Sequence, residues 1–199
     1  MSDVIFVRGF DAPPINKKEI FRYAGIVKPD DVLEGILNEC LAEIEKKLSY
    51  RVCYREFEIV RNGAELDLGF AKTSSRALCK CLDGCERIVL FAATVGIELD
   101  RLIARYSSLS PSRALVLQAI GAERIESLCN AFCNELESEK GNLTPRFSAG
   151  YGDLPLELQH DIFVALDCQR RIGLALNQSL LMSPSKSVSA IVGIVDNKV

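Results

Sequence analysis

One loop of the sequence concentrates side chains that are suited to binding a small molecule. It reads Arg-Phe-Ser-Ala-Gly-Tyr-Gly-Asp from Arg146 to Asp153. Arg146 offers a planar guanidinium that matches a carboxylate, and Tyr151 offers a flat aromatic face with a polar tip. Ser148 and Gly150 are small, so a ligand can approach the backbone between them closely. The loop therefore suits an amino-acid-like ligand with an aromatic base, although a tight loop with a surface arginine is the simpler interpretation.

A cluster of cysteines is the second candidate for chemistry. Cys79, Cys81 and Cys85 lie within seven residues, and three thiols could bind zinc or an iron–sulfur cluster. Their spacing is C-x-C-x3-C, however, whereas zinc sites use C-x2-C pairs, so we favour buried thiols. His160 is the only histidine and has no nucleophile beside it in the sequence. The glycines fit neither a phosphate-binding loop nor a dinucleotide-binding motif.

Composition narrows the classes of function further. The 199 residues are 48% hydrophobic and 26% charged, with a net charge of −3, which favours a folded domain and gives no basic cluster for nucleic acid. The sequence starts without a secretory signal, and its longest apolar run, 88–97, is too short to cross a bilayer. We therefore expect a cytoplasmic protein without membrane segments. In a reducing compartment the eight cysteines are expected to be free thiols, and four of them are predicted on helix faces, where cysteine behaves as a small hydrophobe: Cys40, Cys129, Cys133 and Cys168.

The hydrophobic pattern predicts a mixture of helices and strands. Apolar residues that recur every three to four positions predict the helices, with Asn16 as the cap of the first helix and with Gly25 and Gly141 as helix ends. Alternation of apolar and polar residues, continuous apolar runs and the Asn62-Gly63 turn predict the strands. The predicted helices cover 17–23, 30–48, 74–82, 96–106, 111–139 and 155–172, and the predicted strands cover 4–7, 50–60, 65–71, 87–93, 175–181 and 187–195. This irregular order predicts an α+β fold with an antiparallel-rich twisted sheet. We divide it into an N-terminal appendage, 1–28, and one domain, 29–199.

Two motifs in this sequence resemble a known family. The loop R-F-S-A-G-Y-G-D-L-P, a helix, and then Met182-Ser-Pro-Ser-Lys-Ser-Val-Ser189 occur in the order and spacing of the activation domain of cobalamin-dependent methionine synthase. That family carries an R-x-x-x-G-Y loop and a later M-x-P-x-x-S-V-S strand. The strand end Phe91-Ala-Ala-Thr-Val-Gly96 is similar to that of its smaller stand-alone relatives. The resemblance covers about residues 86–195 and is densest over 146–190.

The resemblance implies a function and a set of partners. In the family, the activation domain binds S-adenosylmethionine and presents its methyl group to cobalamin that has been oxidised to inert Co(II), while a flavodoxin-type donor supplies an electron. The resemblance thus implies an S-adenosylmethionine-binding reactivation subunit of a split methionine synthase. The cobalamin would be held by the partner, a separate cobalamin-binding methionine synthase chain. The chain is not expected to be catalytic on its own.

The resemblance also implies which residues contact the ligand. Arg146 would hold the carboxylate, Ser148 would contact the ligand through its backbone, and Gly150 and Tyr151 complete the R-x-x-x-G-Y loop. The family uses an acidic residue of the preceding long helix toward the ligand's amino group. Glu126 is our choice, with Glu123 as the alternative within one helical turn.

The sequence departs from the family pattern at several points. Ser148 replaces an alanine, and Gly152-Asp153 replaces Pro-Ala, so we expect Asp153 to cap the next helix. The longer family members add a ligand tyrosine beyond the S-V-S strand, whereas this sequence ends at Val199. The alternative function is therefore an interaction protein that caps a corrinoid protein without binding S-adenosylmethionine. A metal or redox protein built on the cysteine cluster is the third hypothesis.

Overall fold

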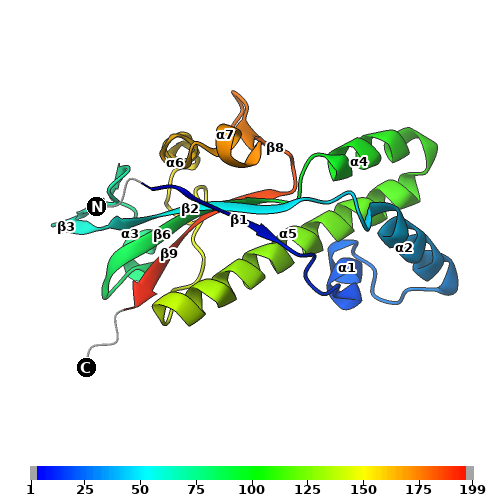
Figure 1. Cartoon of the computed structure of the whole chain (residues 1–199), viewed down its shortest axis with the longest axis horizontal. Helices are drawn as coiled ribbons and strands as arrows, with labels where there is room; N and C mark the ends of the chain where they lie inside the picture. The colour runs from blue at the N-terminus through cyan, green and yellow to red at the C-terminus, as the bar shows by residue number, and fades with distance from the viewer. Residues whose placement is uncertain (1–3, 196–199) are drawn as a thin grey trace.

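A four-stranded antiparallel sheet lies at the centre of the computed structural model, which describes residues 4–195 (Figure 1). Its strands lie in the order β1-β2-β6-β9, and each neighbouring pair is antiparallel. The strands are β1 (Phe6–Phe10), β2 (Tyr50–Glu58), β6 (Cys85–Thr94) and β9 (Ser187–Val195). β6 is buried over most of its length, because helices cover both faces of the sheet.

Each face of the sheet has its own helices and its own hydrophobic cluster. In Figure 1 the long helix α5 runs below the sheet, while α6 and α7 lie above it. The cluster on the α5 face involves α1 (Lys17–Tyr23), α2 (Asp31–Ile44), α4 (Glu98–Leu109) and α5 (Pro111–Lys140). The opposite cluster involves α3 (Arg76–Cys81), the 3-10 turn η1 (Leu156–Leu158), α6 (Gln159–Leu166) and α7 (Cys168–Ile172). The mixture of helices with antiparallel sheets confirms the predicted α+β class.

Two small sheets extend this framework. The predicted hairpin at Asn62-Gly63 is confirmed, and it forms part of a three-stranded sheet. Its strands are β3 (Val60–Asn62), β4 (Glu65–Asp67) and β5 (Lys72–Thr73). A second, two-stranded sheet precedes β9 and consists of β7 (Ala175–Leu176) and β8 (Met182–Ser183).

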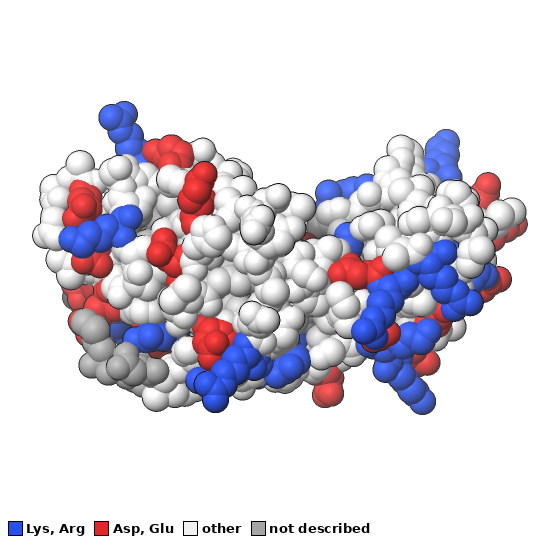
Figure 2. Space-filling view, turned by 90° about the horizontal axis from the view of Figure 1, so that it is seen from above, with Lys and Arg blue, Asp and Glu red and all other residues white. Residues whose placement is uncertain are grey.

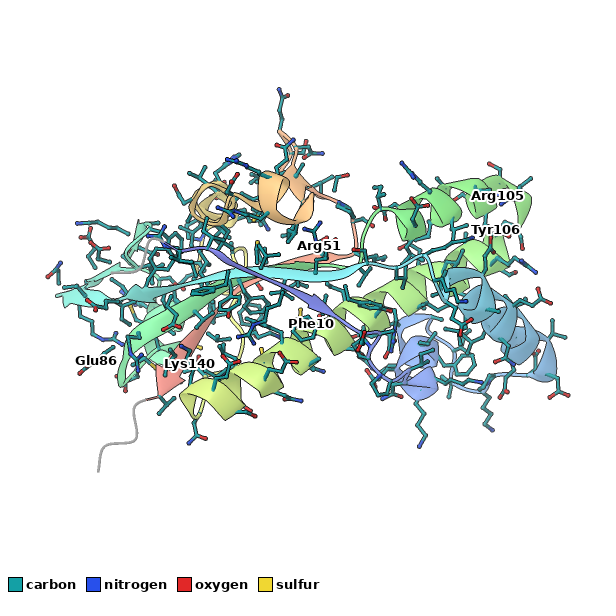
Figure 3. All side chains as sticks on the ribbon, viewed as in Figure 1. Phe10, Arg51, Glu86, Arg105, Tyr106 and Lys140 are labelled. Carbon is teal, nitrogen blue, oxygen red and sulfur yellow. The ribbon has the colours of Figure 1, made fainter. Side chains whose placement is uncertain are left out.

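Aromatic packing fixes α5 against the sheet. Phe132 on α5 is fully buried, and its ring lies 4.9 Å from the ring of Phe91 and 5.2 Å from that of Tyr54. Phe10 at the end of β1 meets the same ring edge-on at 6.4 Å (Figure 3). One helix side chain thus contacts three strands, and such aromatic pairs stabilise beyond the area they bury. As predicted, α5 has Pro111 in its first turn and ends before Gly141.

A buried ion pair joins the N-terminal segment to the middle of α5. Glu123 and Arg124 are each only 2% exposed, and their side chains meet at 2.5 Å. Arg124 also donates to the backbone carbonyls of Pro13 and Pro14, at 2.5 and 2.8 Å. Glu123 accepts from the backbone N–H of Asn16 at 3.2 Å. The segment before α1 is therefore anchored through buried charges, whereas the proposed domain boundary at residue 28 stays a prediction.

Several predicted elements differ from the structure. The helix predicted over 155–172 is broken, because Asp167 adopts a left-handed conformation with a φ of 47° that ends α6 and begins α7. The strand predicted over 175–181 is only β7, since Asn177 accepts from backbone N–H groups of Ser179 and Leu181 and turns the chain. The second helix stops at Ile44 instead of continuing to residue 48. The first strand lies two to three residues later than predicted.

Asp153 caps α3, not the helix that follows it, so this prediction was wrong. Its carboxylate accepts from the hydroxyl of Ser75 at 2.5 Å and from the backbone N–H groups of Arg76 and Ala77 at 2.8 and 3.1 Å. These donors hold the pKa of the Asp153 carboxyl below its usual range. The end of the 146–153 loop is therefore tied to a helix that lies some 75 residues earlier in the sequence.

Replacing Arg124 with Met should destabilise the protein strongly. The substitution leaves the buried carboxylate of Glu123 without a cation and two proline carbonyls without donors, a loss of about 3–5 kcal/mol in the free energy of unfolding. Urea denaturation measures it. The surface variant Arg22→Met, which loses an exposed pair with Glu19 and an exposed contact with the ring of Tyr23, should unfold close to wild type. Equal stabilities of the two variants would contradict a role for the buried pair.

Replacing Asp153 with Asn should lower the melting temperature at neutral pH and weaken its acid dependence. Because the folded pKa of Asp153 lies below the unfolded value of about 3.9, the carboxylate adds stability above that pH, and the stability is lost as the pH falls through the folded pKa. Thermal melts from about pH 7 to pH 2.5 should therefore show wild type and variant converging in acid. The exposed variant Asp161→Asn is the control, and a constant gap between wild type and Asp153→Asn would rule out the capping role.

Candidate functional site

The segment 143–147, which leads into the 146–153 loop, lies along the outer edge of β9. The backbone of Phe147 exchanges two hydrogen bonds with Ile191, at 2.9 and 2.8 Å, and Thr144 donates to Gly193 at 2.9 Å. Successive side chains of an extended segment point to opposite faces. Phe147 is buried in the cluster beside α6, so its neighbour Arg146 lies on the α5 side of the sheet edge.

Arg146 is held by two side chains of α5. Its guanidinium donates to the carboxylate of Glu126 at 2.7 Å and to the amide oxygen of Asn130 at 2.9 Å. Arg146 and Glu126 are 26% and 42% exposed, so solvent and a ligand can reach both charges. Asn130, one helical turn after Glu126, is a partner of Arg146 that sequence reasoning missed.

The two acidic candidates on α5 have different roles. Glu126 meets Arg146, whereas Glu123 is enclosed by Arg124, the backbone N–H of Asn16 and the hydroxyl of Ser127. The carboxylate of Glu123 is thus bound by these three partners inside the protein. The structure brings Glu126, and not Glu123, to the candidate loop.

The two thiols near Arg146 do not neutralise its charge. Burial raises the pKa of Cys129 to about 12 and also raises that of Cys133, although Arg146 acts in the opposite direction on both. Both cysteines are therefore neutral thiols at physiological pH, and they do not compete as anions for the guanidinium. Glu126 is the carboxylate in contact with Arg146.

The remaining loop residues form a tight turn beyond Arg146. The hydroxyl of Ser148 donates to the backbone carbonyl of Ser189 at 2.8 Å, and the Ser148 carbonyl accepts from Tyr151. Gly150 has a φ of 84°, and a Cβ there would stand 3.0 Å from the side chain of Leu156. Tyr151 is 69% exposed, and its ring rests edge-on against Phe147, with 5.4 Å between the ring centres.

Arg146 and Tyr151 contact different neighbours. Arg146 reaches α5, while the ring of Tyr151 rests on Phe147, which belongs to the α6 side. Five surface hollows of about 310 to 600 Å³ lie elsewhere on the described residues, and none of these five is lined by either residue. None of these five hollows therefore joins Arg146 to Tyr151. Seen from above, the molecule narrows between two broader ends, and the middle of this face is mostly uncharged (Figure 2).

The paired charges suit one chemical class of ligand. In a free amino acid a carboxylate and an ammonium are attached to the same carbon atom. A guanidinium and a carboxylate that lie side by side, as Arg146 and Glu126 do, offer one partner to each of these groups. An exposed aromatic ring such as Tyr151 adds a face on which a planar base can rest. The charged pair by itself thus fits the amino-acid part of such a ligand.

The second sequence motif fixes the start of β9. Ser185 donates through its backbone N–H and its hydroxyl to Asp100 of α4, at 2.7 and 2.5 Å. The hydroxyl of Ser187 donates to that of Thr94 on β6 at 2.9 Å. The serines of this motif therefore connect the strand to α4 and β6. Asp100 was not singled out from the sequence, because no local pattern links it to residue 185.

The cysteine cluster borders the segment that leads to Arg146, because the thiol of Cys81 lies 3.6 Å from the backbone carbonyl of Pro145. All eight cysteines are free thiols, and within residues 4–195 no three His, Cys, Asp or Glu side chains are arranged to hold a metal ion. Cys85 is buried, and Cys79 and Cys81 are partly buried. His160 lies at the surface beside a hollow of about 460 Å³. In the part of the chain that the structure describes, every helix is too short or too polar to span a bilayer.

Comparison with known proteins gives a likeness of fold. No protein-family model matches the sequence, and no curated protein sequence matches it. Among solved structures, a crystal structure of the MetH reactivation domain bound to AdoHcy superimposes with a TM-score of 0.73. The match covers 98% of this chain and 80% of that chain, at 16% sequence identity. The chain therefore has the fold of that reactivation domain.

Proposed function

We propose that this chain binds S-adenosylmethionine and acts as the reactivation subunit of a split cobalamin-dependent methionine synthase. The Arg146–Glu126 pair carries the proposal, because it offers adjacent partners to the carboxylate and the ammonium of an amino acid. The likeness of fold to a reactivation domain that was crystallised with AdoHcy supports the same ligand class. The R-x-x-x-G-Y motif supplies the arginine and the exposed tyrosine.

In the proposed complex the chain's residues position the ligand. Arg146 would turn part of its guanidinium from Glu126 to the ligand's carboxylate, and Glu126 would accept from the ligand's ammonium. The exposed ring of Tyr151 would lie against the base. Gly150, which has no side chain, would let the ligand approach the backbone beside that ring. Bound S-adenosylmethionine would supply the methyl group to the cobalamin of a separate methionine synthase chain and be left as AdoHcy, while a flavodoxin-type protein would supply the electron that Co(II) needs. Holding the donor in place is the contribution of this chain.

Replacing Arg146 with Ala should weaken the binding of S-adenosylmethionine and of AdoHcy by about thirtyfold or more, because a hydrogen-bonded charge is lost. Isothermal titration calorimetry measures the affinities, and circular dichroism verifies that the variant is folded. Arg22→Ala is the matched control, since it removes another exposed arginine that pairs with a glutamate. Unchanged affinity in a folded Arg146→Ala protein would reject the assigned site.

One observation favours a second function, an interaction protein that caps a corrinoid protein without binding the ligand. Arg146 is already satisfied by Glu126 and Asn130, and the loop borders open surface. The two functions differ in ligand-dependent stability. Under the first, AdoHcy at a hundredfold excess over its dissociation constant should add about 2.7 kcal/mol to the free energy of unfolding. Thermal-shift measurements with AdoHcy and with adenosine as a control decide between them, because a capping protein shows no shift with either.

A further inference from the structure

The two edges of the main sheet differ, because one is paired with a further segment and the other is not. On the β9 edge the 143–147 segment pairs with the strand through the backbones of Phe147 and Ile191. On the opposite edge β1 pairs with β2, and in the part of the chain that the structure describes no further strand joins it. The outward N–H and C=O groups of β1 can therefore pair with another strand.

The β1 edge lacks the features that usually protect an edge strand. Its register with β2 is regular over Phe6–Phe10, without a bulge, and no proline interrupts it. Its one charged residue, Arg8, is bound to Glu135 and Glu139 of α5, at 3.2 and 2.9 Å. Bulges, prolines and charges are the common means by which proteins prevent strands from pairing edge to edge. Because the charge of Arg8 is held by its own chain, the β1 edge is mainly apolar.

Several side chains along this edge are apolar and exposed. Val4, Phe6 and Val7 are 51%, 42% and 42% exposed. Side chains alternate along a strand, so Arg8 and Phe6 lie on the α5 side and Val7 and Gly9 lie on the other. A Cβ on Gly9 would meet no atom of the described residues within 4 Å. The surface beside Val7 is therefore open, and a glycine inside a strand often marks a place where another backbone approaches.

The sequence of β1 suits antiparallel pairing with a second copy of itself. Residues with outward backbone groups must face one another in such a pair, so the twofold axis passes through a residue and not between two. An axis through Arg8 would set two like charges opposite each other, which destabilises a pair. An axis through Val7 instead sets that valine against its own copy. Phe6 then faces the partner's Arg8, and Ile5 faces the partner's Gly9, which leaves room for the larger side chain.

We propose that β1 is a dimerisation edge, at which two copies of the chain join their sheets into one antiparallel sheet about a twofold axis through Val7. Backbone hydrogen bonds would hold the pair, and the exposed surfaces of Val7 and Phe6 would be removed from water. The inference is independent of the proposed function, because Arg146 lies at the β9 edge. The two β9 edges would form the outer ends of the joined sheet.

Sedimentation velocity of the full chain tests the dimer. Pairing over residues 4–10 makes a small interface, so we expect a shift from monomer to dimer between about 1 and 100 μM. Val7→Lys sets two ammonium groups opposite each other and should weaken the dimer by about tenfold or more. Val60→Lys adds the same charge at another exposed valine, in β3, and should leave the dimer unchanged. A wild-type chain that stays monomeric over this range overturns the inference, as does a folded Val7→Lys variant that dimerises like wild type.

A charge-pairing experiment separates the edge contact from a folding defect. Val7→Lys and Val7→Glu should each be mainly monomeric, whereas their mixture should form a heterodimer, because the axis sets an ammonium against a carboxylate. Circular dichroism verifies that both variants are folded. A mixture of folded variants that stays monomeric would contradict the axis through Val7.

Disulfide cross-linking tests the register, and it also decides if the charged variants do not fold. Cα atoms directly opposite each other lie about 4.5–5.5 Å apart, within the reach of a disulfide. With oxidised glutathione as the oxidant, two thiols of Val7→Cys should form one disulfide between chains while the glutathione is reduced. Arg8→Cys faces Phe6 in this register and should cross-link no more than wild type. Cross-linking of Arg8→Cys without cross-linking of Val7→Cys would overturn the proposed register.

Discussion

The pairing of the 143–147 segment with the edge of β9 is the constraint on which the candidate site depends. Two backbone hydrogen bonds between Phe147 and Ile191 set the register, and the register decides which side chains face α5. A shift by one residue would turn Arg146 toward the α6 cluster and bring Phe147 to the surface. Burial of Phe147 opposes that shift. The hydrophobic core on one face of the sheet thus fixes the arginine on the other.

The long helix α5 joins the anchor of the N-terminal segment to the candidate site. Consecutive turns of it carry a buried pair that anchors the N-terminal segment and an exposed glutamate that meets Arg146. The two glutamates are three residues apart, yet one is enclosed and the other is open to ligand. A change in Glu123 is therefore expected to affect stability, while a change in Glu126 is expected to affect the loop.

Much of this architecture could be predicted from the sequence, and the exceptions have physical reasons. The bounds of α1 and α5 follow from local signals, namely Asn16, Pro111 and Gly141. The break at Asp167 could not be predicted, because a left-handed aspartate inside an apolar helical pattern carries no distinct signature. The capping of α3 by Asp153 is likewise a contact between distant residues. Helical periodicity placed Glu123 and Glu126 on nearly the same side, and the burial of Glu123 together with Arg124 separates their roles.

The open surface beside Arg146 has a kinetic consequence. The guanidinium of Arg146 and the carboxylate of Glu126 are both partly exposed, so in the proposed complex only the side chain of Arg146 would have to turn when the ligand arrives. The residence time of the ligand in the proposed complex would be governed by a few polar contacts and by a partner protein that covers the exposed ring of Tyr151. Retention of the ligand would become a property of the assembly, with release following as soon as the two proteins part.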